Sequence, residues 1–257
     1  MKRARVIPSL LINSQSMEKT QKFMDPIYLG DPMMAVRIWN DLQVDELIIT
    51  DYTTERPDFD FLKELASEAF MPLVYGGGIK DAYDVEKIIK MGFEKITLNR
   101  INFLNDEKAI EIIKQFGSSA VIASVDIKKN FIGKYSIFSK SNLPPKHKKV
   151  LDYCQYIESL GYGEILLNLV DLEATFEGPD YEIASDISKF IDIPTLYQGG
   201  VSSKDEIEQL LIESKVSGVV CGGFFVLNGK LRTPLISYLE PKEIEDISIS
   251  MSKANQK

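Results

Sequence analysis

A glycine-rich loop that occurs twice constrains the fold more than any other feature of the sequence. One apolar run ends in Gly76-Gly77-Gly78, and a similar run ends in Gln198-Gly199-Gly200, offset by 122 positions (198 − 76). Short apolar runs that end in glycine are typical of buried parallel strands followed by helices. Glycines in such a loop let backbone N–H groups approach an anion at the helix N-terminus. The sequence therefore predicts two related strand–loop–helix units, each able to hold an anion.

Two further blocks repeat in the same order. Residues 6–12 resemble 121–127, and residues 45–49 resemble 163–167. Chance similarity between apolar strands is the alternative for any single block, but three blocks in order favour duplication. We therefore expect a single domain at 1–240, with half-barrels at about 1–117 and 118–240, followed by a C-terminal tail at 241–257 that frays.

Strand and helix patterns alternate along the chain. Strands are expected near 5–11, 45–51, 72–76, 95–99, 120–126, 164–169, 193–197 and 217–222. Helices are expected near 32–42, 58–69, 81–91, 105–116, 147–160, 180–190, 203–213 and 234–240. This alternation predicts an all-parallel sheet, and the duplication favours a closed (β/α)8 TIM barrel with a two-fold internal half-barrel repeat. In such a barrel the loops that follow the strands carry the chemistry.

Composition narrows the class of protein. Hydrophobic residues make up 44% of the chain, and no apolar run approaches the ~20 residues that a membrane span needs. The net charge of −8 argues against a nucleic-acid partner. Cys154 and Cys221 are expected to be reduced core thiols, and the sole histidine, His147, excludes a histidine triad or a multi-histidine metal site. We therefore expect a cytoplasmic protein with no metal, no cofactor and no membrane contact.

Two connections are long for a barrel of this kind. They cover 13–30 after the first strand and 128–146 after the fifth strand, and the second is expected to form a hairpin around Gly133. Long connections in a compact domain are usually lids or disordered segments. We favour lids, because both lie on the expected functional face.

Several motifs, in this order, resemble the cyclase subunit of imidazole glycerol phosphate synthase over about residues 1–240. The motifs are the segments 5–10, Gly30-Asp31-Pro32, 44–51, 76–79, Phe116-Gly117-Ser118 and 163–167. The resemblance implies a (β/α)8 barrel paired with a glutaminase at its N-terminal face. Ammonia from the glutaminase would pass along the barrel axis and react with a ribulose-phosphate aminoimidazole substrate at the C-terminal face.

The resemblance also implies site residues. One phosphate-binding cluster would consist of Gly77, Gly78 and Asn99, and the other of Gly199, Gly200, Gly222 and Gly223, for a phosphorylated small molecule or a nucleotide sugar. Lys19, Asp51 and Asp171 would lie on substrate-binding loops. At the opposite pole, Arg5, Glu46, Lys95 and Glu164 match the charged ring that guards the ammonia entrance. The alternative for these four is ordinary surface residues at strand starts, but two acids with two bases favour a compensated ring.

Departures from the family pattern bear on catalysis. Asp126 matches one of the two catalytic aspartates, whereas Leu11 occupies the position of the other. Leucine cannot transfer a proton, and acid–base catalysis needs a titratable group at that place. Other replacements fall in the phosphate loops, at Asn99-Arg100, Glu173-Ala174-Thr175 and Gly222-Gly223-Phe224. These changes argue against cyclase chemistry and leave open whether the chain is itself an enzyme.

A narrower resemblance involves 8–12, 71–72, 75–78 and Leu235-Ile236-Ser237-Tyr238. These segments are similar to the cyclase-like proteins that act in acetamidino modification of bacterial surface sugars. That branch implies a subunit that relays ammonia from a glutaminase to an ATP-dependent sugar amidotransferase. Two alternatives remain: a histidine-biosynthesis cyclase that tolerates Leu11, and a phosphate-binding barrel with another ligand or a structural role.

Overall fold

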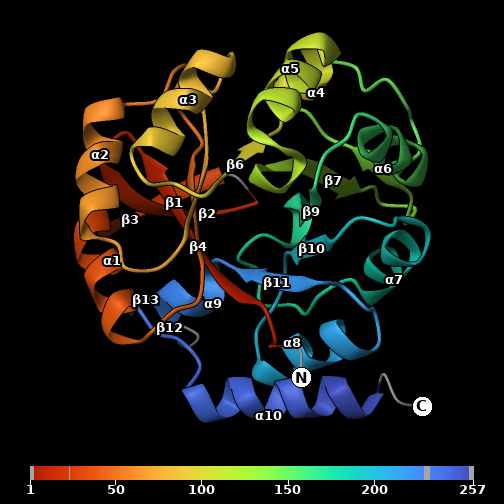
Figure 1. The fold of residues 1–257 in the computed structure, drawn as a ribbon. Coiled ribbons are helices and arrows are strands. Elements are labelled where there is room, and N and C mark those ends of the chain that lie inside the picture. The colour runs from red at the N-terminus through yellow and green to blue at the C-terminus, as the bar shows by residue number, and fades with distance from the viewer. Residues whose placement is uncertain (1–2, 23, 229–231, 255–257) are drawn as a thin grey trace.

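A computed structural model describes residues 3–22, 24–228 and 232–254. Within these ranges eight parallel strands form the barrel (Figure 1): β1 (Val6–Asn13), β4 (Leu47–Asp51), β5 (Leu73–Gly76), β6 (Lys95–Leu98), β7 (Val121–Lys129), β9 (Glu164–Leu169), β10 (Thr195–Gln198) and β11 (Gly218–Cys221). Each strand pairs with the next, and β11 pairs with β1, where Val6 lies opposite Val219. The predicted (β/α)8 barrel is confirmed.

Helices surround the barrel (Figure 1). They are α1 (Pro32–Asp41), α2 (Phe59–Glu68), α3 (Ala82–Lys90), α4 (Ile101–Leu104), α5 (Asp106–Phe116), α6 (Val150–Ser159), α7 (Tyr181–Phe190), α8 (Lys204–Ile212), α9 (Gly223–Val226) and α10 (Pro241–Ala254). Two short 3-10 turns, η1 (Ser118–Ala120) and η2 (Val170–Leu172), precede β7 and follow β9. Most of the long helices begin at an Asp, Asn or Ser whose side chain accepts an N–H of the first turn, which explains where they start.

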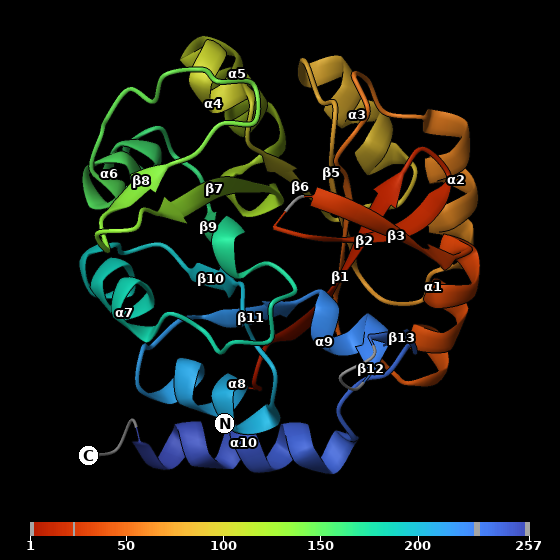
Figure 2. The same ribbon diagram turned by 180° about the vertical axis from the view of Figure 1, so that it is seen from behind.

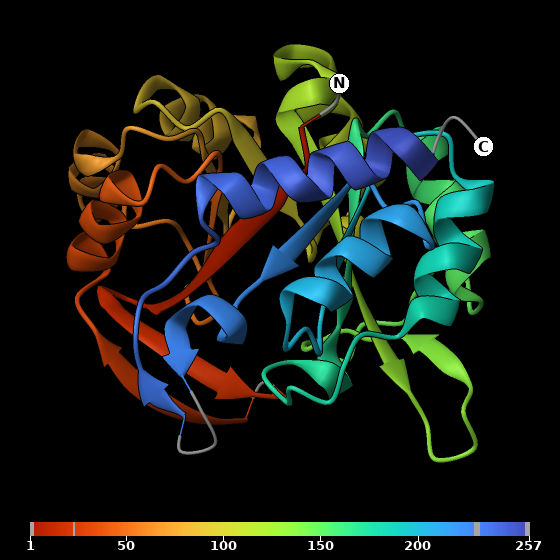
Figure 3. The ribbon, with the colours of Figure 1, turned by 90° about the horizontal axis from the view of Figure 1, so that it is seen from below.

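The eighth helix of the barrel is α10, and two expectations about this end of the chain are wrong. The helix expected at 234–240 does not form, and residues 241–254, expected to fray as a tail, are helical. Ile244, Ile247 and Met251 recur at helical spacing and are buried. Ser248 Oγ accepts a hydrogen bond of 2.9 Å from the backbone N–H of Ala4, at the start of the first strand. Figure 3 shows α10 lying across the barrel beside α8.

Strands make up most of the first long connection and a short part of the second. β2 (Ser16–Gln21) and β3 (Met24–Gly30) continue the sheet from β1 as antiparallel strands. β8 (Tyr135–Ile137) pairs antiparallel with the end of β7, which confirms the hairpin around Gly133. These strands lie on one face of the barrel, at the carboxyl ends of its strands (Figure 2). A smaller ladder joins β12 (Leu227–Asn228) to β13 (Thr233–Pro234).

The side chains inside the barrel form layers, because alternate residues of a strand point to the same side. Ile7, Ile48, Val74, Ile122, Leu166, Leu196 and Val220 form an apolar cluster separate from the main core that lies between sheet and helices. Three members of this cluster, Ile7, Ile48 and Leu166, show the layers on either side of it. Two residues before them come the charged residues Arg5, Glu46 and Glu164, and two residues after them come the polar residues Ser9, Thr50 and Asn168. The interior is therefore charged at the N-terminal end, apolar in the middle and polar at the C-terminal end. No helix of the described ranges is both long enough and apolar enough to cross a membrane.

The packing of α10 gives a direct test of its role. Ile247→Ala removes a fully buried side chain, and we expect the free energy of unfolding to fall by about 2–4 kcal/mol. Lys242→Ala, on an exposed position of the same helix, should change it by less than about 0.5 kcal/mol. Urea unfolding followed by circular dichroism measures both. Equal stability of the two variants would show that α10 is not part of the folded core.

Candidate functional site

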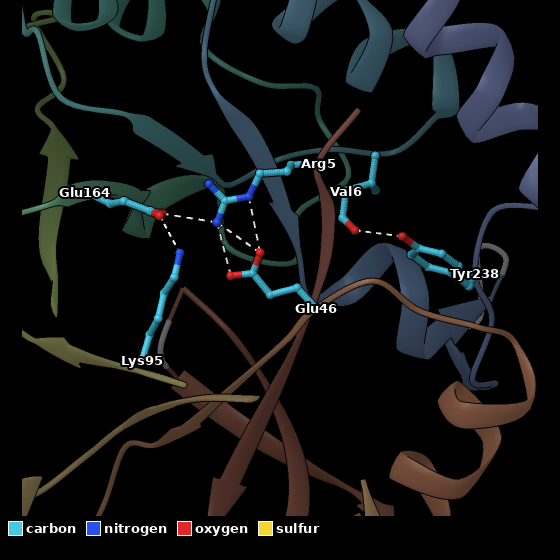
Figure 4. Close-up of polar contacts among 6 residues, drawn as sticks. All are labelled: Arg5, Val6, Glu46, Lys95, Glu164 and Tyr238. Carbon is cyan, nitrogen blue, oxygen red and sulfur yellow. Dashed lines mark hydrogen bonds and ion pairs between the residues drawn. The ribbon is translucent and has the colours of Figure 1, made fainter. Parts of the chain in front are cut away.

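Four charged side chains meet at the N-terminal mouth of the barrel, as predicted (Figure 4). Arg5 holds Glu46 in a two-pronged contact, with Nη2 2.9 Å and Nε 3.2 Å from Glu46 Oε2. The same Nη2 donates to Glu164 Oε2 at 3.1 Å, and Lys95 Nζ pairs with the other oxygen of Glu164. The four residues form a continuous chain, in the order Glu46, Arg5, Glu164 and Lys95.

This N-terminal ring, Arg5, Glu46, Lys95 and Glu164, is largely shielded from solvent. The exposed fraction is 9% for the Glu164 side chain and 26% for Arg5. Burial lowers the pKa of Arg5, but the charges of Glu46 and Glu164 and their hydrogen bonds outweigh it, and the net shift is upward. Two acids and two bases cancel, so the ring closes the end of the barrel without leaving an uncompensated charge.

Asp126 lies at the opposite mouth, at the end of β7. Asn168 of β9 lies beside it in register and donates a hydrogen bond of 2.8 Å to Asp126 Oδ1. Burial raises the pKa of Asp126 to about 6, although hydrogen bonds from Asn168 and Asn99 and the charge of Lys128 act in the opposite direction. Its carboxyl group can therefore hold or release a proton near neutral pH, as a general acid or base requires.

Leu11 lies on β1 at the same end of the barrel. It points inward with Ser9 and Ile7, two and four residues before it, and only 7% of it is exposed. It is paired with Thr50 on β4 and Glu18 on β2. An apolar side chain therefore lies at this point of the C-terminal mouth.

The two glycine loops have nearly the same backbone conformation. Gly77 and Gly78 have φ angles of 141° and 60°, and Gly199 and Gly200 have 136° and 78°. A Cβ on Gly77 would lie 2.4 Å from Asp51 O, and one on Gly199 would lie 2.8 Å from Leu169 Cβ. Each loop thus packs against the end of the preceding barrel strand, where only glycine fits.

The second predicted cluster lines a pocket. Gly199, Gly200, Gly222 and Gly223 share its wall with Lys19, Glu173 and Phe176. Lys19 is buried and forms an ion pair with the buried Glu173. A Cβ on Gly222 would come within 3.2 Å of Lys19 Nζ, and one on Gly223 within 3.1 Å of Phe176 Cζ. Glycine at these two positions makes room for the inserted lysine and phenylalanine.

Sequence reasoning noted Glu173 as a departure from the family pattern but missed its contacts with β2. Thr20 Oγ1 lies 3.0 Å from both carboxylate oxygens of Glu173. The backbone oxygen of Glu173 accepts a hydrogen bond of 3.2 Å from Lys22 N. The β2–β3 segment is thus attached to the loop after β9. Because Glu173 already neutralises Lys19, an anion entering this pocket would meet a carboxylate as well as backbone N–H groups. Anion binding there stays a prediction.

The remaining predicted residues do not converge on this pocket. Asp51 is buried, and its Oδ1 accepts from the N–H groups of Thr53 and Thr54, so it stabilises its own turn. Asp171 accepts a bond of 2.7 Å from Lys129 N and so fixes the end of β7. Asn99 Nδ2 donates to Ser124 O at 3.0 Å, close to Asp126.

Comparison with known proteins places these features in context. The family model described as "Histidine biosynthesis protein" matches residues 5–232. Two relatives named "Putative imidazole glycerol phosphate synthase subunit" are hisF2 of Pseudomonas aeruginosa, 37% identical over 95% of this chain and 99% of that protein, and hisF3 of Vibrio vulnificus, 34% identical over 95% of both. The "Imidazole glycerol phosphate synthase subunit HisF" of Alkaliphilus metalliredigens is 31% identical over 87% of this chain and 90% of its own length.

The raised pKa of Asp126 predicts a pH effect on stability. The folded state keeps the proton to about pH 6, whereas an unfolded aspartate loses it near pH 4, so this group's stabilising contribution is full at low pH and is lost as pH rises through 6. Asp126→Asn removes this titration. We expect the difference in unfolding free energy, variant minus wild type, to rise by about 2–3 kcal/mol from pH 4 to pH 7. Urea unfolding across that range measures the difference, and a constant difference would contradict the shift.

Proposed function

Because the chain belongs to the histidine biosynthesis protein family, we propose that it is a cyclase-like barrel subunit of a glutamine-dependent amidotransferase system. It would relay ammonia from a glutaminase for acetamidino modification of a surface-glycan sugar. The observation that carries this proposal is the contrast between the two mouths of the barrel. All four charges of the N-terminal ring are paired, whereas the apolar Leu11 lies at the C-terminal mouth, where the resemblance to the cyclase leads us to expect a carboxylate.

The layered interior supports a path for neutral ammonia. The N-terminal ring presents charges to the entrance, and the seven-residue apolar cluster lies next along the axis. Ammonium would have to lose its hydration to enter that layer, which is costly for an unpaired charge. Neutral ammonia has no such charge to desolvate. The barrel therefore favours transfer of ammonia over ammonium or other ions.

The polar mouth and the chemistry of amidination define the two partners. A glutaminase would dock over the N-terminal ring, and relatives named as synthase subunits fit a protein that works with a partner. To convert an N-acetyl group to an acetamidino group, ammonia must add to the amide carbon and the oxygen must leave. An ATP-using enzyme can supply the leaving group by transferring a phosphoryl or adenylyl group to that oxygen. That enzyme would receive ammonia at the C-terminal mouth.

A specific observation favours a second candidate, the cyclase of histidine biosynthesis. Asp126, which the resemblance matches to one catalytic carboxylate, has a pKa of about 6 and accepts a hydrogen bond from Asn168. The family description and the names of the relatives agree with this alternative. The two candidates differ in what happens to the ammonia at the C-terminal mouth.

A direct assay separates the two candidates. With ammonium and the ribulose-phosphate aminoimidazole substrate, we expect turnover at least about 10²–10⁴-fold below that of a synthase with both carboxylates, because one proton-transfer group is missing. Leu11→Asp should recover little, since the Lys19–Glu173 ion pair lines the pocket that is predicted to bind a phosphate. Product formation is followed by absorbance or chromatography. Turnover at the rate of an ordinary cyclase that Asp126→Asn abolishes would establish the cyclase instead.

The N-terminal ring is tested in a reconstituted system of glutaminase, this chain and amidotransferase. Glu164→Ala removes the acid between Arg5 and Lys95, and we expect amidinated sugar per glutamate released to fall severalfold while glutamine hydrolysis continues. Arg5→Ala should act in the same direction and also reduce stability, because it leaves Glu46 without its partner. Arg3→Ala breaks an ion pair with Asp45 outside the ring and is the matched control. An unchanged ratio in both ring variants would show that the ring does not guard an ammonia entrance.

A further inference from the structure

The hairpin after β7 and the segment that follows it have an unusual charge. Residues 128–149, here called the basic arm, contain seven lysines and no Asp or Glu, in a chain whose net charge is −8. The rest of the chain therefore carries −15 (−8 − 7). A run of like charges is usually a solvated or disordered segment. The basic arm differs from such a segment because it is anchored in the fold.

Several contacts hold the basic arm in place. β8 pairs with the end of β7, and Lys129 Nζ binds Asp180 at 3.0 Å. Lys146 pairs with Asp106, and Lys140 Nζ donates to Tyr52 O at 3.0 Å, so the arm is attached to both halves of the barrel. Its shape is thus determined before any partner binds, which lowers the ordering cost of binding.

Other side chains of the basic arm are left facing solvent. Across the part of the chain that the structure describes, Lys134, Lys148 and Lys149 form no ion pair. At the tip of the hairpin, Phe131 is 100% exposed and Ile132 is 72% exposed. Figure 3 shows this hairpin projecting from the barrel on the same side as β2 and β3. A fixed projection with an apolar tip and unpaired positive charges has the features of an anchor for an acidic protein surface.

We propose that the basic arm is the docking surface for an acidic face of the ammonia-consuming enzyme. This inference rests on the proposed function, because it names where the second partner binds. The arm continues β7, the strand that carries Asp126, so an enzyme held by it lies over the mouth from which ammonia emerges. Complementary charge would speed association and fix orientation, and the tip would supply apolar contact.

The charge distribution favours a protein over an anionic membrane as the occupant. The arm is positive, but the chain as a whole is negative, so a broad anionic surface would repel most of the molecule. An acidic patch on a protein can contact the arm alone, and screening confines its effect to about 8 Å at physiological salt. Anionic lipid and a second copy of this chain, which is itself acidic, are the outcomes against which the proposal is tested.

The test measures binding of purified amidotransferase to immobilised complex of this chain with its glutaminase, by surface plasmon resonance. Phe131→Ser with Ile132→Ser should weaken binding about 10–100-fold through faster dissociation, as loss of a central apolar anchor does. Lys134→Glu, Lys148→Glu and Lys149→Glu together should slow association about tenfold at low salt and flatten its salt dependence.

The matched controls are Phe70→Ser, at another exposed aromatic, and the triple change Lys63→Glu, Lys114→Glu and Lys242→Glu, on exposed helix positions. In both controls the association and dissociation rates of the amidotransferase should stay within about twofold of wild type. All variants should keep the glutaminase bound.

The outcomes distinguish this inference from the proposed function. If the wild-type complex does not bind the amidotransferase, the proposed function fails and the inference fails with it. If wild type binds and the arm variants bind equally well, only the docking surface is wrong. Arm-dependent binding to vesicles of anionic phospholipid, or arm-dependent self-association in analytical ultracentrifugation, without an effect on amidotransferase binding, would assign the arm to a membrane or to a second copy and overturn the proposal.

Discussion

The ladder between β1 and β11 is the constraint on which the rest of this structure depends. It joins the last barrel strand to the first, with Val219 N donating to Arg5 O at 2.9 Å, and leaves the eight-stranded barrel without a free edge. Closure fixes which alternate residues face inward and at what height along the axis. One inner wall of the barrel therefore carries Arg5, Ile7, Ser9 and Leu11 in this order, from the charged N-terminal end to the C-terminal mouth. A shift of one residue in this register would exchange inner and outer side chains on β1.

The N-terminal ring shows how the barrel keeps charges at the end of its interior. Arg5 contacts both acids at once, because the planar guanidinium can bind carboxylates on more than one edge. Lysine at this position would offer a single point charge and could not hold Glu46 and Glu164 in the same way. Well-packed apolar residues would give comparable or greater stability, since buried ion pairs seldom add net stability. Folding alone therefore does not require four charges in this place.

Much of the fold could be predicted from the sequence, because the two halves repeat both their apolar runs and their glycine loops. The positive φ angles at Gly77 and Gly78, repeated at Gly199 and Gly200, are the physical requirement behind that pattern. The prediction failed at α10, where a polar composition concealed the helical spacing of Ile244, Ile247 and Met251. It also missed the pairing of Lys19 with Glu173, because these residues lie far apart in sequence and meet only when β2 folds over the loop after β9. Local patterns determine elements, whereas contacts between loops depend on tertiary packing.

The contacts of the C-terminal segment have a consequence for synthesis of the chain. Tyr238 donates to Val6 O at 2.8 Å (Figure 4). Ser248 accepts from Ala4 N, so residues that follow the eighth barrel strand hold the first one. The strand that pairs with one edge of β1 is β11, which follows the other seven barrel strands in sequence. That edge of β1 therefore stays unpaired until β11 has been made, and a nascent chain presents the kind of surface that aggregates or binds chaperones. The barrel can therefore close only once β11 has been made, after the other seven barrel strands.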